Sequence, residues 1–167
     1  MIKENKAIFL DRDGVINKKR NDYVKSIDEL EIFSDVGRGI SILKKMGFLI
    51  IVITNQSIIN RKIITVNELE KIHTTIQNNL KKNSCSIDSF YFCPHTPDEN
   101  CDCRKPKSGL LLQAIDDFSI NSSESWMIGD CLTDIQAGKT AGCKTILLKK
   151  NMSFSNIVDM IKLENTS

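Results

Sequence analysis

The chain has 167 residues, of which 41% are hydrophobic and 26% are charged, and its formal net charge is +2. These values are typical of one globular domain, residues 1–167, that can bury a substantial core. No stretch has the length of a membrane-spanning helix, and no basic stripe indicates binding to nucleic acid or to a membrane surface. The first residues lack the apolar core of a secretory signal, so we expect a cytosolic protein. In a reducing compartment, the six cysteines favour a metal site over disulfide bonds.

Short apolar runs alternate with amphipathic segments in the first half of the chain. Residues 7–10 predict a buried strand, which a polar stretch over residues 17–29 follows. We then expect a helix over residues 35–46 and a wholly apolar strand over residues 48–53. The sequence Thr-Val-Asn-Glu at residues 65–68 is a capping box, which predicts the start of another helix.

The same alternation continues in the second half of the chain. A strand is expected over residues 87–92, a loop over residues 93–107, and then a helix capped by Ser108. The remaining predicted elements are a strand over 126–128, a helix over 134–141, a strand over 144–148 and a last helix around 157–161. This order predicts an α/β fold with a doubly wound parallel sheet. No insertion is long enough to form a separate cap domain.

Asp11 and Asp13 come directly after the first predicted strand. Their spacing places both carboxylates on one side of an extended chain, and Gly14 allows a ligand to approach the backbone closely. Open α/β sheets bind ligands at the carboxyl ends of their strands. Two close carboxylates repel each other unless a cation or a shared proton lies between them. Considered alone, this pair is explained equally well by a solvated turn.

Polar groups also follow three other predicted strands. They are Thr-Asn-Gln-Ser at 54–57, Arg-Lys at 104–105, and Gly-Asp at 129–130 with Asp134 four residues further on. Each group taken alone is explained by turn, surface or helix-capping chemistry. Because all of them follow strands, they predict one shared site for phosphate and metal. Carboxylates can attack phosphorus, exchange protons and bind Mg²⁺, while lysine, hydroxyl and amide groups stabilise phosphoryl oxygens.

The loop over residues 93–107 contains a second set of metal-ligand residues. Three thiols and one imidazole occur within eleven residues and suit tetrahedral zinc: Cys93, His95, Cys101 and Cys103. The alternative is a group of incidental loop residues. With four protein ligands the zinc would be structural, and it would hold in place the basic residues that follow Cys103.

Four segments of the chain resemble the motifs of the haloacid dehalogenase superfamily of phosphatases. They are Phe-Leu-Asp-Arg-Asp-Gly at 9–14, Thr-Asn-Gln-Ser at 54–57, Arg-Lys-Pro at 104–106, and Ile-Gly-Asp-Cys-Leu-Thr-Asp at 128–134. The resemblance covers roughly residues 6–148 and implies the Rossmann-like fold of that superfamily. The most similar groups are the heptose bisphosphate phosphatases and the related histidinol-phosphate phosphatases, in which zinc loops of this composition occur.

The resemblance implies a role for each residue that matches a motif. Asp11 would be the nucleophile and Asp13 the general acid and base. Mg²⁺ would be bound by Asp11, Asp130 and the main-chain carbonyl of Asp13. Residues 21–24 fall where such enzymes carry a loop that contacts substrate. The residues expected to contact the phosphate or the rest of the substrate are Arg12, Thr54, Asn55, Arg104 and Lys105.

The resemblance implies a Mg²⁺-dependent phosphatase that forms an aspartyl-phosphate and removes the 7-phosphate of D-glycero-D-manno-heptose 1,7-bisphosphate. Its partner would be a small phosphorylated sugar, and we expect a monomer. Histidinol phosphate or another phosphomonoester is the alternative substrate. A second alternative is a zinc-stabilised regulatory domain that binds phosphate without turnover. Asp13 argues against that alternative, because binding alone does not require an acid and base.

Overall fold

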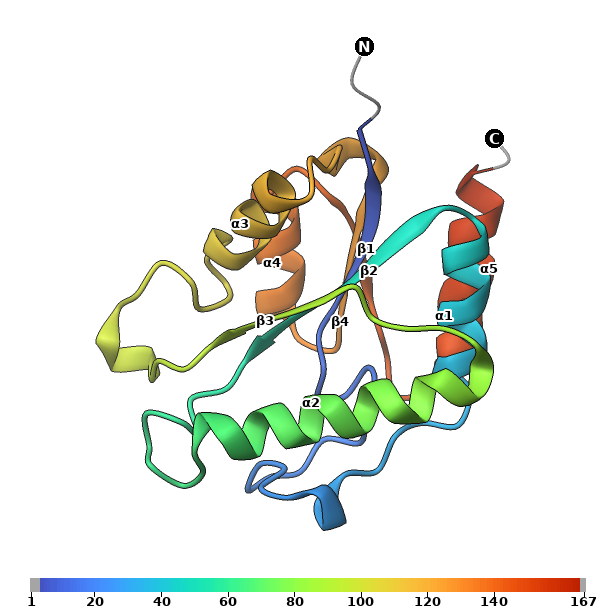
Figure 1. The fold of residues 1–167 in the computed structure, drawn as a ribbon. Helices are drawn as coiled ribbons and strands as arrows, with labels where there is room; N and C mark the ends of the chain where they lie inside the picture. The colour runs from blue at the N-terminus through green and yellow to red at the C-terminus, as the bar shows by residue number, and fades with distance from the viewer. Residues whose placement is uncertain (1–3, 166–167) are drawn as a thin grey trace.

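The computed structural model describes residues 4–165. Its five described strands are parallel and form one sheet in the order β3-β2-β1-β4-β5 (Figure 1). This arrangement confirms the predicted doubly wound sheet. The strands are β1 (Lys6–Leu10), β2 (Phe48–Asn55), β3 (Ser89–Cys93), β4 (Trp126–Gly129) and β5 (Lys144–Leu147).

Helices cover both faces of the sheet. One face carries α1 (Val36–Lys45), α2 (Val66–Leu80) and α5 (Phe154–Asn165), and the other carries α3 (Gly109–Asp117) and α4 (Leu132–Thr140) (Figure 1). Between β1 and α1, residues 11–35 contain only a short 3-10 helix, Ile27–Glu29, so this segment holds no cap domain. Within residues 4–165, no helix is both long enough and apolar enough to cross a membrane.

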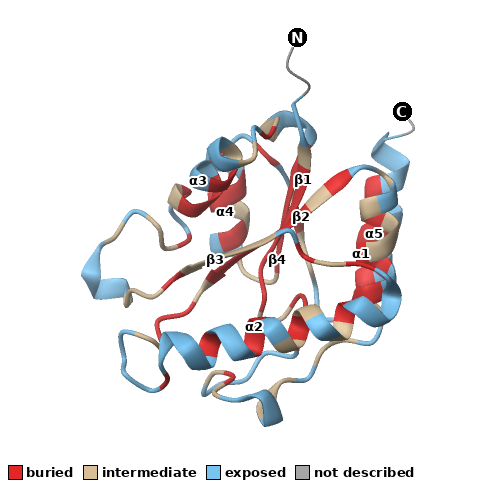
Figure 2. Ribbon diagram, in the orientation of Figure 1, coloured by how far each residue is buried: buried red, intermediate tan, exposed pale blue. Residues whose placement is uncertain are grey.

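The sheet is buried because successive side chains of each strand enter different cores. In β1, Ile8 and Leu10 pack into the core beneath α1, α2 and α5. Ala7 and Phe9 pack into the second core, beneath α3 and α4. Both faces of the central strands are therefore covered, as the continuous apolar runs predict, and Figure 2 shows β1 and β4 buried along most of their length.

Two boundaries and one helix cap differ from the sequence prediction. β3 begins at Ser89 because the backbone N–H and C=O of Ile87 bond to the side-chain amide of Gln77, at 2.8 and 2.6 Å, and do not join the sheet. The helix expected at residue 134 begins two residues earlier, at Leu132. Ser108 precedes α3, but its side chain makes no capping hydrogen bond there. The capping box of Thr65 and Glu68 is confirmed.

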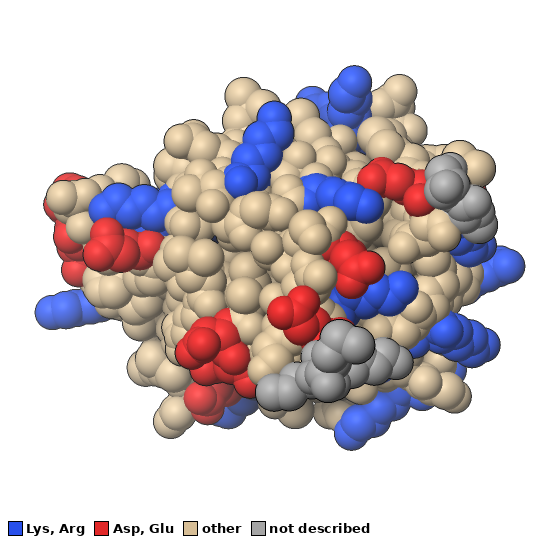
Figure 3. Space-filling view, turned by 90° about the horizontal axis from the view of Figure 1, so that it is seen from above, with Lys and Arg blue, Asp and Glu red and all other residues tan. Residues whose placement is uncertain are grey.

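Charge is mixed on the end of the molecule where the strands begin. Figure 3 views this end and shows acidic and basic side chains interspersed over it. The polar residues that follow the strands gather at the opposite end of the sheet.

Candidate active site

Asp11 follows β1, the central strand of the sheet. Because β2 and β4 flank β1, the ends of three strands meet around this residue. The N–H of Asp11 donates to the carbonyl of Ile128 on β4 at 2.9 Å, which holds its backbone against the sheet. Its carboxylate is buried and lies 2.9 Å from Nζ of Lys105. A buried ion pair therefore lies where the strand order changes direction, the usual ligand site of such sheets.

Lys105 uses all three protons of its buried ammonium group. Besides Asp11, they reach Oδ1 of Asp134 at 2.7 Å and the carbonyl of Ile53 at 2.7 Å. Asn55 fixes the lysine backbone, because its amide donates to the Lys105 carbonyl and accepts from the Lys105 N–H, each at 3.1 Å. The ammonium group is thus placed before any ligand binds. Its peptide bond to Pro106 is cis.

Burial and neighbouring charges set the protonation of this pair. Burial raises the pKa of Asp11 to about 6, although the positive charge of Lys105 opposes the shift. Burial also lowers the pKa of Lys105, but the Asp11 and Asp134 carboxylates outweigh burial and raise that pKa above its ordinary value. The lysine therefore stays charged beside the site, and Asp11 becomes an available carboxylate near neutral pH.

Asp13 is held by donors on three sides. Nη2 of Arg12 lies 3.0 Å from each of its carboxylate oxygens. Asn17 donates to Oδ1 at 2.9 Å, and Nε2 of Gln56 donates to Oδ2 at 2.8 Å. Burial raises the pKa of Asp13, but the Arg12 charge and these hydrogen bonds outweigh burial and hold the pKa below its ordinary value. Gln56 also donates to Oγ1 of buried Thr54 at 3.0 Å, which places this hydroxyl in the same network.

The residues around Asp130 fit a divalent cation. Its Oδ1 is buried and has no hydrogen-bond partner among the described residues, as expected for an oxygen that binds metal. Its Oδ2 lies 3.0 Å from Nζ of Lys19, so a cationic group already approaches this carboxylate. Gly14 has no side chain between Asp130 and the end of β1, and a Cβ built there meets the Asp130 carboxylate. Asp11 and the Asp13 carbonyl would add oxygen donors of the hard kind that Mg²⁺ prefers.

The Cys93, His95, Cys101 and Cys103 side chains converge on one point. Their ligand atoms all lie within 4.8 Å of one another, and five of the distances between them are 3.1 to 3.5 Å. Tetrahedral zinc with Zn–S bonds of about 2.3 Å separates its sulfur ligands by about 3.8 Å, so a small outward movement accommodates the ion. His95 presents Nδ1 to the sulfurs, and its carbonyl accepts from Arg104 at 3.1 Å.

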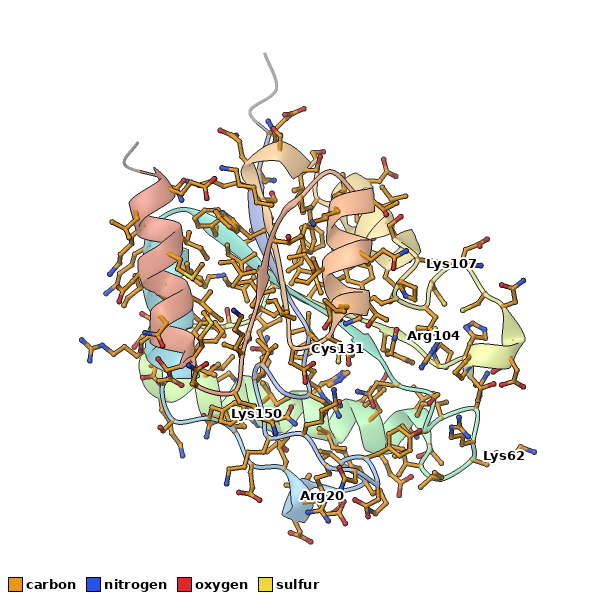
Figure 4. All side chains as sticks on the ribbon, turned by 180° about the vertical axis from the view of Figure 1, so that it is seen from behind. Arg20, Lys62, Arg104, Lys107, Cys131 and Lys150 are labelled. Atoms are coloured by element: carbon orange, nitrogen blue, oxygen red, sulfur yellow. The ribbon has the colours of Figure 1, made fainter. Side chains whose placement is uncertain are left out.

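Basic side chains from four different loops lie toward the end of the sheet where the strands end. Figure 4 shows Arg104 on one side of Cys131 and Lys150 on the other, with Arg20 beyond α2 and Lys62 at the outer edge, pointing away from the molecule. These four residues follow β3, β5, β1 and β2 respectively, and Arg20 and Lys150 line the two cavities beside the carboxylates, so they form a basic rim. Such a rim attracts an anionic substrate.

Two cavities open beside the carboxylates. The smaller, of about 320 Å³, is lined by Asp13, Lys19, Arg20, Asn21 and Tyr23. Asn21 and Tyr23, from the segment 21–24 expected to contact substrate, therefore line the same cavity as Asp13. The larger, of about 1030 Å³, extends from Asp130 toward Lys149 and the first turn of α5.

The structure brings most of the predicted residues together and reveals others. Asn55 contacts the Lys105 backbone, and Arg12 is turned into the core. Asp134, which the sequence placed in the polar group after β4 without a role of its own, is the second partner of Lys105 and also caps α4. Lys19 lies 3.2 Å from Sγ of Cys131 as well as beside Asp130. Asn17 could have been anticipated from its place in the turn after Asp13, but no local pattern indicated the contact made by Lys19.

Comparisons with known proteins agree with this site. A family model described as HAD-hydrolase-like matches residues 102–155. The D-glycero-beta-D-manno-heptose-1,7-bisphosphate 7-phosphatase of Neisseria meningitidis serogroup A is 41% identical over 143 residues, 86% of this chain and 76% of the relative. The enzyme of the same name from Helicobacter pylori strain J99 is 42% identical over 149 residues, 89% of this chain and 85% of the relative.

A solved structure also matches along nearly the whole chain. The D,D-heptose 1,7-bisphosphate phosphatase of B. bronchiseptica, complexed with magnesium and phosphate, superposes with a TM-score of 0.88 and 28% identity. The match covers 95% of this chain and 99% of that one.

Proposed function

Because the chain belongs to the haloacid dehalogenase-like hydrolases, and within them to the D-glycero-β-D-manno-heptose-1,7-bisphosphate 7-phosphatase family, we propose that it removes the 7-phosphate of that bisphosphate. The observation that carries this proposal is the buried Asp11 carboxylate, which faces Lys105 and has Asp13 two residues away. A binding domain without turnover does not require that arrangement.

The reaction follows from these three residues. An oxygen of Asp11 attacks phosphorus, and the bond from phosphorus to the sugar oxygen breaks as Asp13 gives a proton to that oxygen. Because the contacts of Asp13 lower its pKa, this step uses the minor, protonated form of its carboxyl group. Water then attacks the aspartyl-phosphate and gives a proton to Asp13. The phosphorus–Asp11 bond breaks, and inorganic phosphate leaves. Lys105 and Thr54 stabilise the negative charge on the equatorial phosphoryl oxygens in both steps.

Asp11, Asp130 and the main-chain carbonyl of Asp13 would hold Mg²⁺. When bound, the cation neutralises charge on the phosphate and on the carboxylates. The unpartnered oxygen of Asp130 supports this assignment, and so does the relative from B. bronchiseptica that was crystallised with magnesium and phosphate.

The remaining expectations complete the proposal. Zinc bound by the four Cys and His ligands would hold the loop that carries Arg104 and Lys105. Arg12, Asn55 and Arg104 would place the substrate by direct contact or through their neighbours. We propose a single-domain, monomeric, cytoplasmic enzyme.

A ³¹P NMR assay tests the proposal on substrates. Both anomers of D-glycero-D-manno-heptose 1,7-bisphosphate, together with histidinol phosphate, are incubated with protein and Mg²⁺. We expect loss of the 7-phosphate resonance, an unchanged 1-phosphate resonance, and kcat/KM highest for a bisphosphate anomer. Faster hydrolysis of histidinol phosphate, or loss of the 1-phosphate, would contradict the proposal.

A further inference from the structure

Arg12 separates Asp11 from Asp13 in sequence, yet its side chain is fully buried. Nη2 bonds both oxygens of Asp13, and Nη1 lies 3.5 Å from Nε2 of His73. Nε is buried and has no partner among the described residues. The guanidinium group is therefore held inside the protein between one carboxylate and one imidazole.

His73 comes from α2, on the buried side of that helix. Its ring stacks on Phe90 of β3, with centroids 4.4 Å apart and planes inclined by 14°. Burial, together with the positive charge of Arg12, lowers the pKa of His73 to about 3, so the ring is neutral at physiological pH. A neutral imidazole has one acceptor nitrogen, and we assign that acceptor to Nε2, since it faces an N–H group of Arg12.

The contacts of Asp13 indicate what this arrangement does. Asn17 and Gln56 each bond one oxygen of the carboxylate, whereas Arg12 bonds both. Among the described residues, His73 alone bonds Nη1, so without it only packing restrains the far side of the guanidinium group. Rotation of Arg12 would turn the Asp13 carboxyl group, and proton transfer depends steeply on the position of the acid.

We propose that His73 is a positioning residue for proton transfer, which acts through Arg12 to orient the carboxyl group of Asp13 toward the leaving oxygen. This inference rests on the proposed function in one respect, the role of Asp13 as the acid. It does not depend on which sugar phosphate is the substrate, and it is testable on any alkyl phosphate that the protein hydrolyses.

The test compares two kinds of leaving group. An alkyl phosphate releases an alkoxide that needs a proton, whereas p-nitrophenyl phosphate releases a stable phenolate that does not. kcat/KM reports the steps up to loss of the alcohol, so a misplaced acid lowers it for the alkyl substrate alone. Damage to the fold or to Asp11 lowers kcat/KM for both substrates.

The informative substitution is His73→Phe, which keeps a ring on Phe90 and removes the acceptor for Arg12. We expect kcat/KM for the alkyl phosphate to fall at least about tenfold. The loss should not exceed the roughly 10²- to 10⁴-fold that general acid catalysis contributes. For p-nitrophenyl phosphate, kcat/KM should change less than about twofold. His73→Gln restores an acceptor and should recover most of the loss. His73→Leu supplies the same comparison if the Phe variant does not fold.

Ile76→Val is the matched control, because Ile76 lies in the core one turn further along α2. It should leave the ratio of the two kcat/KM values unchanged. An equal loss on both substrates in His73→Phe, or no loss on the alkyl phosphate, would overturn the inference. Failure of the heptose bisphosphate as a substrate would instead overturn the proposed function.

Discussion

At the scale of single residues, Gly14 controls how closely Asp130 can approach the end of β1. Its φ is +94°, a conformation that other residues rarely adopt, and a Cβ placed there meets the Asp130 carboxylate. The sequence suggested a close backbone approach at this position, and the structure identifies the approaching group as a proposed metal ligand.

We expect Gly14→Ala to raise the Mg²⁺ concentration needed for half-maximal activity and to lower stability by about 1–2 kcal/mol, because of backbone strain. Activity titrated with Mg²⁺ and thermal unfolding measure the two effects. Gly47→Ala is the control, since its φ is +87° and the nearest atom to an added Cβ is Cε of Lys6 at 3.8 Å. If Gly47→Ala changes the Mg²⁺ requirement as much as Gly14→Ala does, the effect comes from strain and not from Asp130.

His73 links stability to pH. Its pKa is about 3 in the folded protein and about 6.5 in an unfolded chain, so the unfolded state binds the proton more tightly. The stabilisation of the folded protein by the neutral His73 ring is complete above pH 6.5. It is lost as the pH falls toward 3, by up to roughly 1.4 kcal/mol per pH unit. The charged groups that act on the ring are Arg12, which lowers its pKa, and Asp13, which raises it.

Urea unfolding of wild type and His73→Gln between pH 7.5 and 4.5 isolates this contribution. As the pH falls, the unfolding free energy of wild type should decrease relative to that of His73→Gln. A difference that stays constant over this range would show that His73 has the same pKa in the folded and unfolded states.

At the scale of elements, the loop of residues 93–107, which would bind zinc, is held together internally and packs on α3. Arg104 donates to the His95 carbonyl, and the N–H of Gly109, at the start of α3, donates to the Asp102 carbonyl at 3.2 Å. A Cβ at Gly109 would overlap that carbonyl, so the loop packs directly on the helix backbone. The loop therefore determines where the backbone preceding Lys105 runs.

Cys101→Ser should remove zinc, lower the melting temperature and reduce kcat/KM by about 10- to 100-fold. Metal analysis, thermal unfolding and steady-state kinetics measure these three changes. Cys85→Ser, in the core beneath α1 and α2, should keep its zinc. Zinc loss from Cys101→Ser without any change in stability or kcat/KM would rule out a structural role for the ion.

The elements themselves were predictable, because their signals are local. Alternating apolar residues and the capping box at Thr65 place strands and helices within a few residues. Contacts between elements leave no such signal. One such contact is that of the Gln77 amide, which shortens β3. Another is that of His73. The sequence alone places His73 beside the apolar residues of α2, and it contacts Arg12 only because α2 packs across the sheet. The pairing of Lys105 with Asp134 likewise depends on tertiary structure.

At the scale of the whole molecule, parallel strands deliver every motif to the same end of the sheet. The order β3-β2-β1-β4-β5 places Asp11 between the residues that follow β2 and those that follow β4. This convergence was predictable, because strand-helix alternation implies parallel strands and hence a shared carboxyl end. The distribution of charge was not, since Arg20, Lys62, Arg104 and Lys150 lie toward the same end of the sheet only in the folded chain.

We expect this basic rim to make kcat/KM for a bisphosphate fall as ionic strength rises, more steeply than for a monophosphate. Lys150→Glu, in the wall of the larger cavity, should weaken both the rate and its salt dependence. Lys82→Glu, just beyond the C-terminal end of α2, makes the same change of charge away from the rim. Equal effects of the two substitutions would mean that net charge, and not the rim, attracts the substrate.

The most direct test of the account is the rate of phosphate release from D-glycero-D-manno-heptose 1,7-bisphosphate by wild type and Asp11→Asn, with Mg²⁺ present. Melting temperature and zinc content show that the variant is folded. We predict that kcat/KM falls by roughly 10⁴-fold or more, to background, because the attacking oxygen of the nucleophile is lost. Comparable phosphate release by the folded variant would contradict the central role of Asp11.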